Sequence, residues 1–289
     1  MEIGIVGLGL IGGSLGLDLR RLGHQVCGVS RQEKTCQLAI ARGAVDRAST
    51  ELASLVKARV IFICTPLDAI QATIKQLIPH LRPDTILTDV GSVKAPVVEA
   101  ILPLWSNFIG GHPMAGTAET GIAAAQMGLF AQRPYVLTPV ETTSAMVVDI
   151  VAAVAGSLGA QVHYCEPAAH DRAVAWISHL PTFASASLIA ACLSEPEVAV
   201  LELAQQLASS GFRDSSRVGG GNPQLGRLMA EYNRTELLRS LRYYRQHLDQ
   251  FIAQIEQQEW AGLEQQLLQT QQARPQFLKP LDKELSSGK

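Results

Sequence analysis

The fold of this chain is decided by residues 2–13, which read EIGIVGLGLIGG. A short apolar run, Glu2–Val6, leads into the pattern G-x-G-x-x-G, and a helix-compatible segment, 11–22, follows it. In a strand–turn–helix unit, the first glycine of this pattern permits the tight turn. The second lets the backbone approach a pyrophosphate, and the third lets the helix pack closely on the strand. The helix N-terminus then offers N–H groups to the anion. The stretch predicts a dinucleotide site, and a glycine-rich turn without a ligand is the alternative.

We expect the whole turn to contact the cofactor, through Gly7, Leu8, Gly9, Leu10, Ile11 and Gly12. The end of the second predicted strand, Gln25–Val29, should select between the two nicotinamide cofactors. NAD sites usually carry an acidic residue there for the ribose 2′-hydroxyl. This chain has Ser30 and Arg31 instead, and a hydroxyl beside a guanidinium suits a 2′-phosphate. We therefore expect NADP, while a solvated Arg31 at the start of a helix is the alternative.

Strand-like and helix-like segments alternate from there to residue 164. The further predicted strands are 59–64, 85–88, 107–110, 135–138 and Gln161–Tyr164, and the helices are 32–42, 67–81, 94–104 and 142–158. Such alternation predicts βαβ units and a parallel sheet. Thr65 and Pro66 end one strand at the edge where doubly wound sheets bind ligands. We expect them to line the cofactor crevice, although a plain strand-terminating turn is the alternative.

The second half of the chain has no convincing strand after Pro167. Its predicted helices are 168–193, interrupted at Pro181, then 195–209, 225–255 and 259–272, with a break at 219–223. The expected fold is an α/β Rossmann-type doubly wound sheet followed by an all-α helical domain. We place an NADP-binding Rossmann domain at 1–165, a helical dimerisation and substrate domain at 166–279, and a tail at 280–289.

Composition narrows the partners and the location. The 289 residues are 47% hydrophobic and 17% charged, which argues against disorder. A net charge of -2 excludes a nucleic-acid binder driven by bulk positive charge. Five cysteines without a C-x-x-C pair indicate free thiols in a reducing compartment. No apolar run reaches the ~18 residues of a membrane span, and no cluster has metal-ligand spacing. We expect a cytoplasmic protein without a metal or a membrane partner.

Two segments after later strands carry candidate chemistry. Residues 88–94 read TDVGSVK, and residues 110–117 read GGHPMAGT. His112 stands between glycines and a proline, so we expect it on a tight loop where the backbone approaches a ligand. With an unperturbed pKa near ~6.5, such a side chain accepts a proton at neutral pH. A loop-capping histidine is the alternative.

Together with SHLP at 178–181 and GFRDSSR at 211–217, these segments occur in an order that resembles the prephenate/arogenate dehydrogenases of tyrosine biosynthesis. The resemblance covers roughly residues 1–275. It implies a cyclohexadienol substrate that carries a ring carboxylate. Hydride would leave the ring carbon that bears the hydroxyl and pass to the nicotinamide. The ring carboxylate would leave as CO2, and aromatisation would drive the step.

The resemblance also implies residue roles. His112 would accept the proton of the substrate hydroxyl, Ser92 would orient that histidine near the nicotinamide, and Arg217 would hold the ring carboxylate. His179 would line the substrate pocket, although a buried structural histidine is the alternative. These roles are physically sensible, because a base must lie within about 3 Å of the hydroxyl and an arginine fork suits a carboxylate. Pro181 should bend the helix beside His179.

Departures from the family pattern bear on the substrate. The family often has a second histidine after Leu-Pro, where this chain has Thr182, and often a tryptophan after Pro223, where this chain has Leu225. We count Thr182 and Arg213 among the substrate-side residues, although Arg213 and Asp214 are equally a local ion pair. By resemblance, both positions face the side chain of the substrate, which is a keto acid in prephenate and an amino acid in arogenate. Because the loss of an imidazole and an indole there would change which side chain is accepted, we expect arogenate. The alternatives are prephenate oxidation to 4-hydroxyphenylpyruvate, or a dual cyclohexadienyl dehydrogenase.

Two other classes compete with this interpretation. Short β-hydroxyacid dehydrogenases and ketopantoate-type reductases use a lysine on a helix of the second domain, but no lysine stands between Lys94 and Lys279. An NADP-sensing protein without catalysis would keep the glycine pattern and need neither His112 nor Arg217. The pair His170-Asp171 is interpreted as structural. Apolar helices that one Rossmann domain cannot cover predict a homodimer, chiefly through 188–193 and Val198–Leu207.

Overall fold

The computed structural model describes residues 1–117 and 119–278. The predicted tail, 280–289, and residue 279 of the predicted helical domain lie outside these described residues. The chain divides into two compact units, the first ending at Leu237 and the second beginning at Leu238. The first unit holds the sheet and the helices as far as α10, so this division does not coincide with the boundary expected at residue 165.

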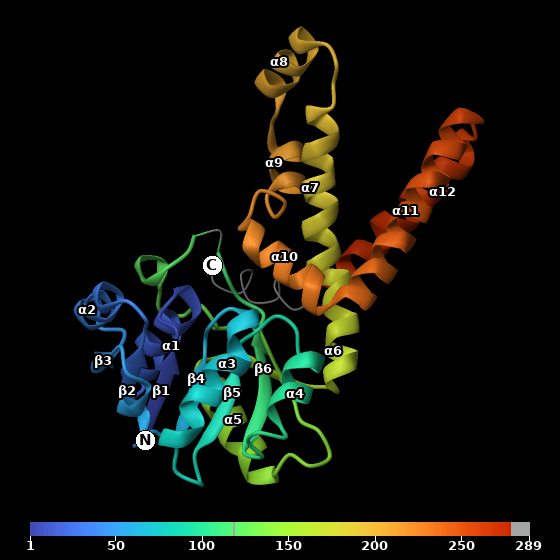
Figure 1. Cartoon of the computed structure of the whole chain (residues 1–289). Coiled ribbons are helices and arrows are strands. Elements are labelled where there is room, and N and C mark those ends of the chain that lie inside the picture. Colours follow the sequence, from blue (N-terminus) through green and yellow to red (C-terminus); the bar gives the residue numbers. More distant parts are fainter. Residues whose placement is uncertain (118, 279–289) are drawn as a thin grey trace, which may run out of the picture. The chain divides into compact units, whose positions relative to one another are not determined.

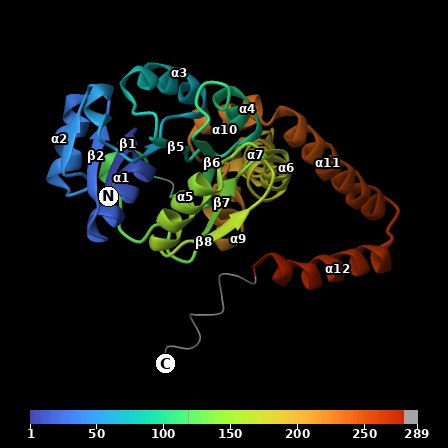
Figure 2. The same cartoon turned by 90° about the horizontal axis from the view of Figure 1, so that it is seen from below.

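The first unit is built on one sheet of eight strands in the order β3-β2-β1-β4-β5-β6-β7-β8. Strands β1 to β6 are labelled in Figure 1, and β7 and β8 in Figure 2. All neighbouring strands run parallel except β6 and β7, which are antiparallel. The strands are β1 (Glu2–Val6), β2 (Gln25–Val29), β3 (Arg47–Ser49), β4 (Val60–Ile63), β5 (Ile86–Asp89), β6 (Phe108–Pro113), β7 (Pro134–Thr138) and β8 (Gln161–Tyr164). The short edge strand β3 was not predicted, because its polar sequence, Arg-Ala-Ser, has no apolar run.

Helices cover both faces of this sheet. Along β4, Val60 and Phe62 belong to one apolar cluster, while Ile61 and Ile63 belong to another. Since a strand buried on both faces requires helical layers on both sides, the predicted Rossmann-type doubly wound fold is confirmed. Helix α5 packs against β6, β7 and β8 (Figure 2). The helices that flank the sheet are α1 (Leu10–Arg21), α2 (Glu33–Ala41), α3 (Leu67–Leu77), α4 (Ala95–Ile101) and α5 (Ala145–Ser157).

The expectation that His112 lies on a loop is wrong, because His112 lies within β6 and pairs with Val136 of β7. The glycines before it serve close packing rather than a turn. A Cβ on Gly111 would lie 2.7 Å from the backbone oxygen of Asp89 and 3.0 Å from Thr88 Oγ1. Glycine is therefore required by the close approach of two strands, a reason that the sequence alone did not separate from a loop.

The remaining helices follow β8, and no strand occurs after Tyr164 in the described part of the chain. A π-helical turn, Ala175–His179, separates α6 from α7, so the helix becomes irregular before Pro181 rather than at it. Helix α9 was not predicted, because serine and glycine are weak helix formers. The helices are α6 (Pro167–Val174), α7 (Leu180–Leu193), α8 (Val198–Leu207), α9 (Ser210–Ser216), α10 (Pro223–Tyr232), α11 (Arg234–Glu256) and α12 (Trp260–Leu278).

One helical stretch, Pro167–Leu193, is long and apolar enough to cross a membrane, judged by length and composition only. The sequence contains no uninterrupted apolar run of this length, because polar residues interrupt the stretch. Its mean hydropathy is high in spite of them. Two of these polar residues, His170 and Asp171, are buried in the folded chain. They belong to the polar network described below.

Candidate active site

The three glycines of the turn after β1 have three different environments. Gly7 has φ +99°, and a Cβ there would lie 2.5 Å from the backbone oxygen of Cys64. A Cβ on Gly12 would lie 2.1 Å from the oxygen of Gly7, whereas a Cβ on Gly9 would meet nothing within 4 Å. Gly7 makes the turn, Gly12 packs the helix on the strand, and Gly9 leaves open space in front of the N-terminus of α1. This arrangement is what a pyrophosphate requires.

The other predicted cofactor residues of the turn divide into backbone and side-chain cases. Leu8 is buried, and Leu10 and Ile11 are partly buried against the same apolar core. Their side chains therefore support the turn by packing on this core. At the end of β2, Ser30 Oγ accepts a hydrogen bond from the Gln32 amide at 3.4 Å. Arg31 is exposed and forms no ion pair within the described residues.

Two buried hydroxyl groups lie at the ends of the neighbouring strands β4 and β5. Thr65 Oγ1, after β4, and Ser92 Oγ, after β5, have no hydrogen-bond partner among the described residues. Thr65 adjoins the glycine turn, since a Cβ on Gly7 would lie 3.0 Å from its backbone nitrogen. Buried polar atoms in folded proteins almost always have partners, so two such atoms at a ligand-binding edge fit a polar ligand. The residues present fit a nicotinamide dinucleotide, whereas Pro66 is exposed beside them.

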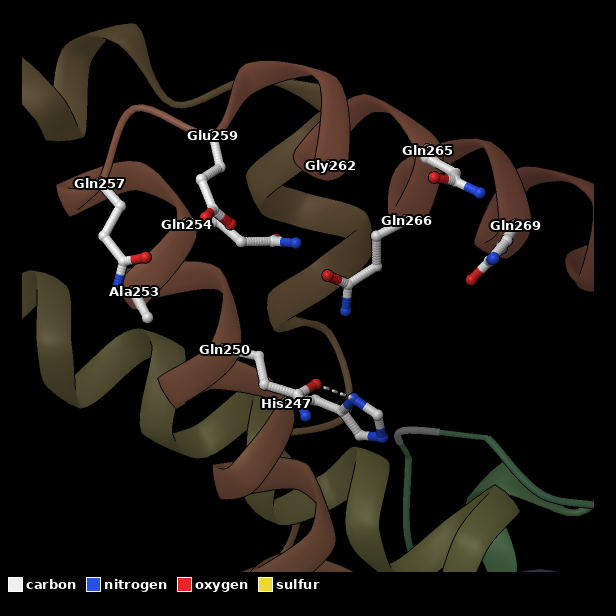
Figure 3. Close-up of a pocket in the computed structure, with 10 residues that line it drawn as sticks. All are labelled: His247, Gln250, Ala253, Gln254, Gln257, Glu259, Gly262, Gln265, Gln266 and Gln269. Carbon is white, nitrogen blue, oxygen red and sulfur yellow. Dashed lines mark hydrogen bonds between the residues drawn. The ribbon is translucent and has the colours of Figure 1, made fainter.

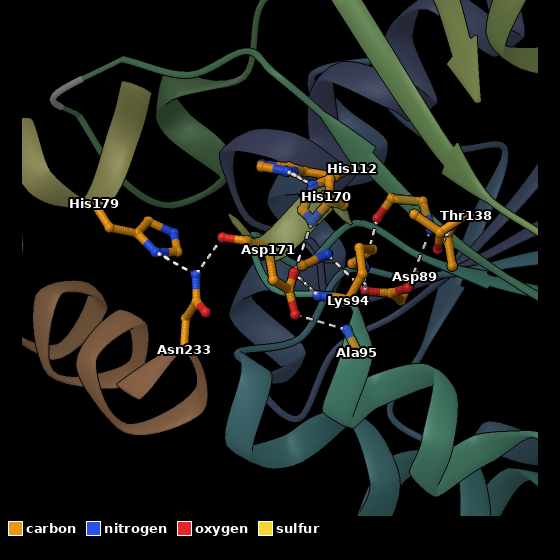
Figure 4. Close-up of polar contacts among 12 residues, drawn as sticks. Asp89, Lys94, Ala95, His112, Thr138, His170, Asp171, His179 and Asn233 are labelled. Carbon is orange, nitrogen blue, oxygen red and sulfur yellow. Dashed lines mark hydrogen bonds and ion pairs between the residues drawn. The ribbon is translucent and has the colours of Figure 1, made fainter. Parts of the chain in front are cut away.

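His112 is almost buried, with 8% of its surface exposed, and its ring is bonded to a second histidine. His112 Nδ1 lies 2.8 Å from His170 Nε2, and His170 Nδ1 lies 2.8 Å from Asp171 Oδ1 (Figure 4). The hydrogen-bond partner of His112 is therefore His170, whereas the expected partner, Ser92, forms no hydrogen bond to it in the described chain. The interpretation of His170-Asp171 as merely structural missed this contact, because the two histidines are 58 positions apart.

The direction of these hydrogen bonds assigns the proton on His112. The Asp171 carboxylate already accepts the backbone N–H groups of Lys94, at 2.7 Å, and Ala95, at 2.8 Å. As an acceptor it takes the Nδ1–H of His170, whose Nε2 in the neutral ring then accepts the Nδ1–H of His112. His112 Nε2 is left with its lone pair, which is the form that a general base needs.

Burial keeps His112 in its neutral form. Desolvation lowers the pKa of His112 well below its ordinary value of 6.5, and the nearby His170 and Lys94 lower it further. At neutral pH the ring is therefore free to accept a proton. The imidazolium formed in that step would keep its Nδ1–H on His170, and the Asp171 carboxylate behind it stabilises the positive charge.

A buried ion pair holds the strand that carries His112. The side chains of Lys94 and Asp89 are fully buried and contact each other through Nζ and Oδ2. Lys94 Nζ also donates to the Gly111 oxygen at 2.7 Å, and the Gly111 amide donates to Asp89 Oδ1 at 3.3 Å. The β5–β6 pairing ends at Thr88 and Ile109. The ion pair thus replaces the strand-to-strand bonds one residue before His112, and the sequence analysis did not identify it.

His179 ends the π-helical turn and is fully buried. Its Nδ1 lies 3.1 Å from Asn233 Nδ2, while its Nε2 has no hydrogen-bond partner among the described residues. Burial lowers the pKa of His179 to about 4, so the ring is neutral. π-Helical turns occur frequently at functional sites. Thr182, one turn later, donates its hydroxyl to the Ser178 oxygen at 3.1 Å.

The two predicted arginines are exposed. Arg213 Nε lies 3.7 Å from Asp214 Oδ1, with side chains 78% and 76% exposed, so the local ion pair exists. Arg217 follows α9 and forms no hydrogen bond or ion pair in the described part of the chain. Its segment is held on α7, because the Gly219 amide donates to Ser185 Oγ at 2.9 Å. This contact attaches the Arg217 segment to the helix that follows His179, and no hydrogen bond joins Arg217 to His112.

One cleft lies away from these residues. It measures about 590 Å³, lies between α11 and α12 in the second unit, and is lined mainly by glutamines together with His247 (Figure 3). None of the predicted site residues lines it. Among residues 1–117 and 119–278, no group of three His, Cys, Asp or Glu side chains is arranged to hold a metal ion.

Comparison with known proteins agrees with this arrangement. Residues 15–164 match the family model described as prephenate dehydrogenase, nucleotide-binding domain, and residues 166–269 match prephenate dehydrogenase, dimerization domain. A prephenate dehydrogenase of Bacillus subtilis (strain 168) is 29% identical over 90% of this chain and 71% of its own.

Two solved structures are similar along almost the whole chain. The crystal structure of Synechocystis arogenate dehydrogenase is 54% identical, with a TM-score of 0.85, over 96% of this chain and 100% of that one. Prephenate dehydrogenase from A. aeolicus, in complex with hydroxyphenyl propionate and NAD+, is 25% identical, with a TM-score of 0.90, over 96% and 98%. Because the two family models follow one another over most of its length, the chain belongs to the prephenate/arogenate dehydrogenase family of oxidoreductases.

Proposed function

We propose that this protein oxidises arogenate to tyrosine, with loss of CO2 and transfer of a hydride to NADP. The observation that carries the proposal is the hydrogen-bonded chain His112–His170–Asp171, from which we infer a neutral His112 ring with its lone pair on Nε2. In the same sheet, the glycine turn follows β1, and the two buried hydroxyls that fit a dinucleotide follow β4 and β5. The 54% identity to an arogenate dehydrogenase supports the choice of substrate.

In the proposed reaction, bound NADP supplies the hydride acceptor, and Thr65 and Ser92 would hold its nicotinamide half. His112 Nε2 accepts the substrate hydroxyl proton, because hydride loss from the carbinol carbon becomes easier as that proton leaves. Arg217 binds the ring carboxylate and His179 contacts the substrate, which positions the ring. When the carboxylate leaves as CO2, its bonding electrons complete the aromatic ring. The phenolate then regains its proton from His112.

The substrate preference is tested by steady-state kinetics with NADP. We expect a larger kcat/KM for arogenate than for prephenate, with tyrosine as the product. The Thr182 hydroxyl donates a hydrogen bond to the Ser178 oxygen of its own helix at 3.1 Å. The Thr182→His variant should restore the imidazole that the family often has here, and should therefore reduce the ratio of kcat/KM for arogenate to kcat/KM for prephenate. An equal or larger kcat/KM of the wild type for prephenate would contradict the proposal and favour a prephenate or dual cyclohexadienyl dehydrogenase.

The cofactor preference is tested on the same reaction. We expect kcat/KM for NADP to exceed that for NAD. In the Arg31→Ala variant, kcat/KM with NADP should fall about tenfold or more, whereas kcat/KM with NAD should change little. Only NADP carries the 2′-phosphate that Arg31 would bind, and hydrogen bonds to charged groups are stronger than those between neutral groups. The Arg82→Ala variant is the matched control, since Arg82 is an arginine that precedes β5, away from the carboxyl ends. A wild-type preference for NAD would exclude this role of Arg31.

We also propose a homodimer in the cytoplasm. The match to a dimerization domain over residues 166–269 supports the dimer. So do exposed apolar side chains on α7 and α8, namely Leu188, Leu193, Val198, Leu203 and Leu207. A second copy that covers these side chains would explain why the stretch Pro167–Leu193 is apolar without a membrane.

A further inference from the structure

Asn233 lies between α10 and α11, in the first compact unit, and is buried. Its Nδ2 atom lies 2.8 Å from the backbone oxygen of Asp171 and 3.1 Å from His179 Nδ1 (Figure 4). Asn233 therefore connects the helix that carries the Asp171 carboxylate to the second histidine of the site. None of the roles assigned above uses this amide.

The chemistry of the three partners determines where the protons lie. A backbone carbonyl only accepts, so the Asn233 atom that faces the Asp171 oxygen must be the NH2 group rather than the amide oxygen. That group carries a second N–H, and this N–H is directed at His179 Nδ1. A neutral imidazole that accepts at Nδ1 must carry its proton on Nε2.

We propose that Asn233 is a positioning residue, which holds His179 in the tautomer protonated at Nε2 so that this nitrogen donates a hydrogen bond to an oxygen of the substrate. The Nε2 atom is buried and has no partner among the described residues. A buried donor without a partner is costly, which is expected where a ligand supplies the acceptor. The inference rests on the proposed function only for the identity of that substrate.

The surroundings of His179 favour the neutral ring that this tautomer requires. Desolvation lowers its pKa to about 4, and His170 lowers it as well, whereas the Asp171 carboxylate raises it. Asn233, which contacts the ring at Nδ1, is uncharged. The ring therefore stays neutral over the pH range in which dehydrogenases are assayed.

Asp171 is the common element of both histidines. Its carboxylate orients His170 and so leaves His112 Nε2 as an acceptor, while its backbone oxygen orients Asn233 and so leaves His179 Nε2 as a donor. One residue of α6 thus gives the two rings opposite hydrogen-bonding roles. His112 can therefore accept the proton of the substrate hydroxyl, while His179 donates a hydrogen bond to another oxygen of the same substrate.

The first test is the tautomer itself, which needs no turnover. In nitrogen-15 spectra of histidine side chains at pH 7, with His179 assigned by its loss in His179→Gln, we expect a protonated Nε2 and an unprotonated Nδ1. In Asn233→Asp, the carboxylate is an acceptor, so the proton should move to Nδ1 or the ring should become charged. A protonated Nδ1 in the wild type, or an unchanged ring in Asn233→Asp, would overturn the proposal whatever the substrate proves to be.

The second test separates positioning from stability. With arogenate and NADP, Asn233→Ala is expected to raise KM for arogenate about tenfold, the effect of one hydrogen bond to a charged group, while kcat changes less. In a His179→Ala background the same substitution should add little, because the two residues act as one unit. Additive effects on KM would overturn the proposal, and so would an unchanged KM.

The matched control is Asn107→Ala. Asn107 donates its amide to the Pro83 oxygen at 3.0 Å, before β6 and away from the histidines. The Asn107→Ala variant therefore loses one amide hydrogen bond without any change at His179, and its KM for arogenate should equal that of the wild type. A rise in KM equal to that of Asn233→Ala would show a general stability effect and refute a specific role. If neither arogenate nor prephenate is oxidised, the proposed function fails, and the nitrogen-15 result still decides the tautomer.

Discussion

Replacing His112 with asparagine is expected to lower kcat by about 10²–10⁴-fold, the usual contribution of a general base. The Kd for NADP should stay within about twofold, because the glycine turn and the end of β2 are untouched. Asparagine is small enough for the strand position beside Val136 and retains a polar group toward His170, so the fold should survive. The measurements are steady-state kinetics with arogenate and a titration of the protein with NADP.

The control for His112→Asn is His163→Asn, a histidine in β8 that is exposed. Its kcat should equal that of the wild type, since it belongs to no polar network described here. A protein that senses NADP without catalysis would bind the cofactor and have no turnover in either variant or in the wild type. If His112→Asn retained its full kcat, the assignment of the base would be wrong.

Among the variants considered in this experiment, Lys94→Met, which removes the charge of Lys94, should lose the most unfolding free energy. In Lys94→Met, the Asp89 carboxylate stays buried without its ammonium, and breaking a buried pair in this way costs about 3–5 kcal/mol of unfolding free energy. Adding Asp89→Asn should recover part of this loss, because it removes the buried charge, while its single amide oxygen can still accept one of the two N–H groups, Gly91 or Gly111, that donate to separate carboxylate oxygens of Asp89. Urea unfolding of the three proteins measures these differences.

Lys75→Met is the control for this experiment, because Lys75 is exposed on α3. Its unfolding free energy should change by at most about 0.5 kcal/mol. A loss in Lys94→Met no larger than that of Lys75→Met would show that the buried pair contributes nothing to stability. A double variant less stable than Lys94→Met would show that the negative charge on Asp89 is itself needed.

Local patterns predicted the sheet and the dinucleotide turn well. The strands Glu2–Val6, Gln25–Val29 and Gln161–Tyr164 have the predicted bounds, because short strand-forming segments are recognised from neighbouring residues. The spacing of the glycines in the turn is equally local, because the whole pattern belongs to one short strand–turn–helix unit.

Features that depend on distant residues were missed. His112 was expected on a loop, because two glycines and a proline mark a loop unless another strand presses against them, and here Asp89 does. His170 was interpreted as structural, because no neighbouring residue in the sequence indicates that its Nε2 atom lies 2.8 Å from His112 Nδ1. The same holds for Lys94, whose burial depends on the end of the β5–β6 pairing.

The amino-acid sequence by itself determined the order of strands and helices, the glycine turn and the set of side chains able to carry the chemistry, because these follow from residue type and spacing along the chain. Only the tertiary structure decided which ring nitrogen each histidine presents. That choice depends on the backbone and carboxylate of Asp171, which the fold brings to both rings, and a proton moves to whichever nitrogen its neighbours leave for it.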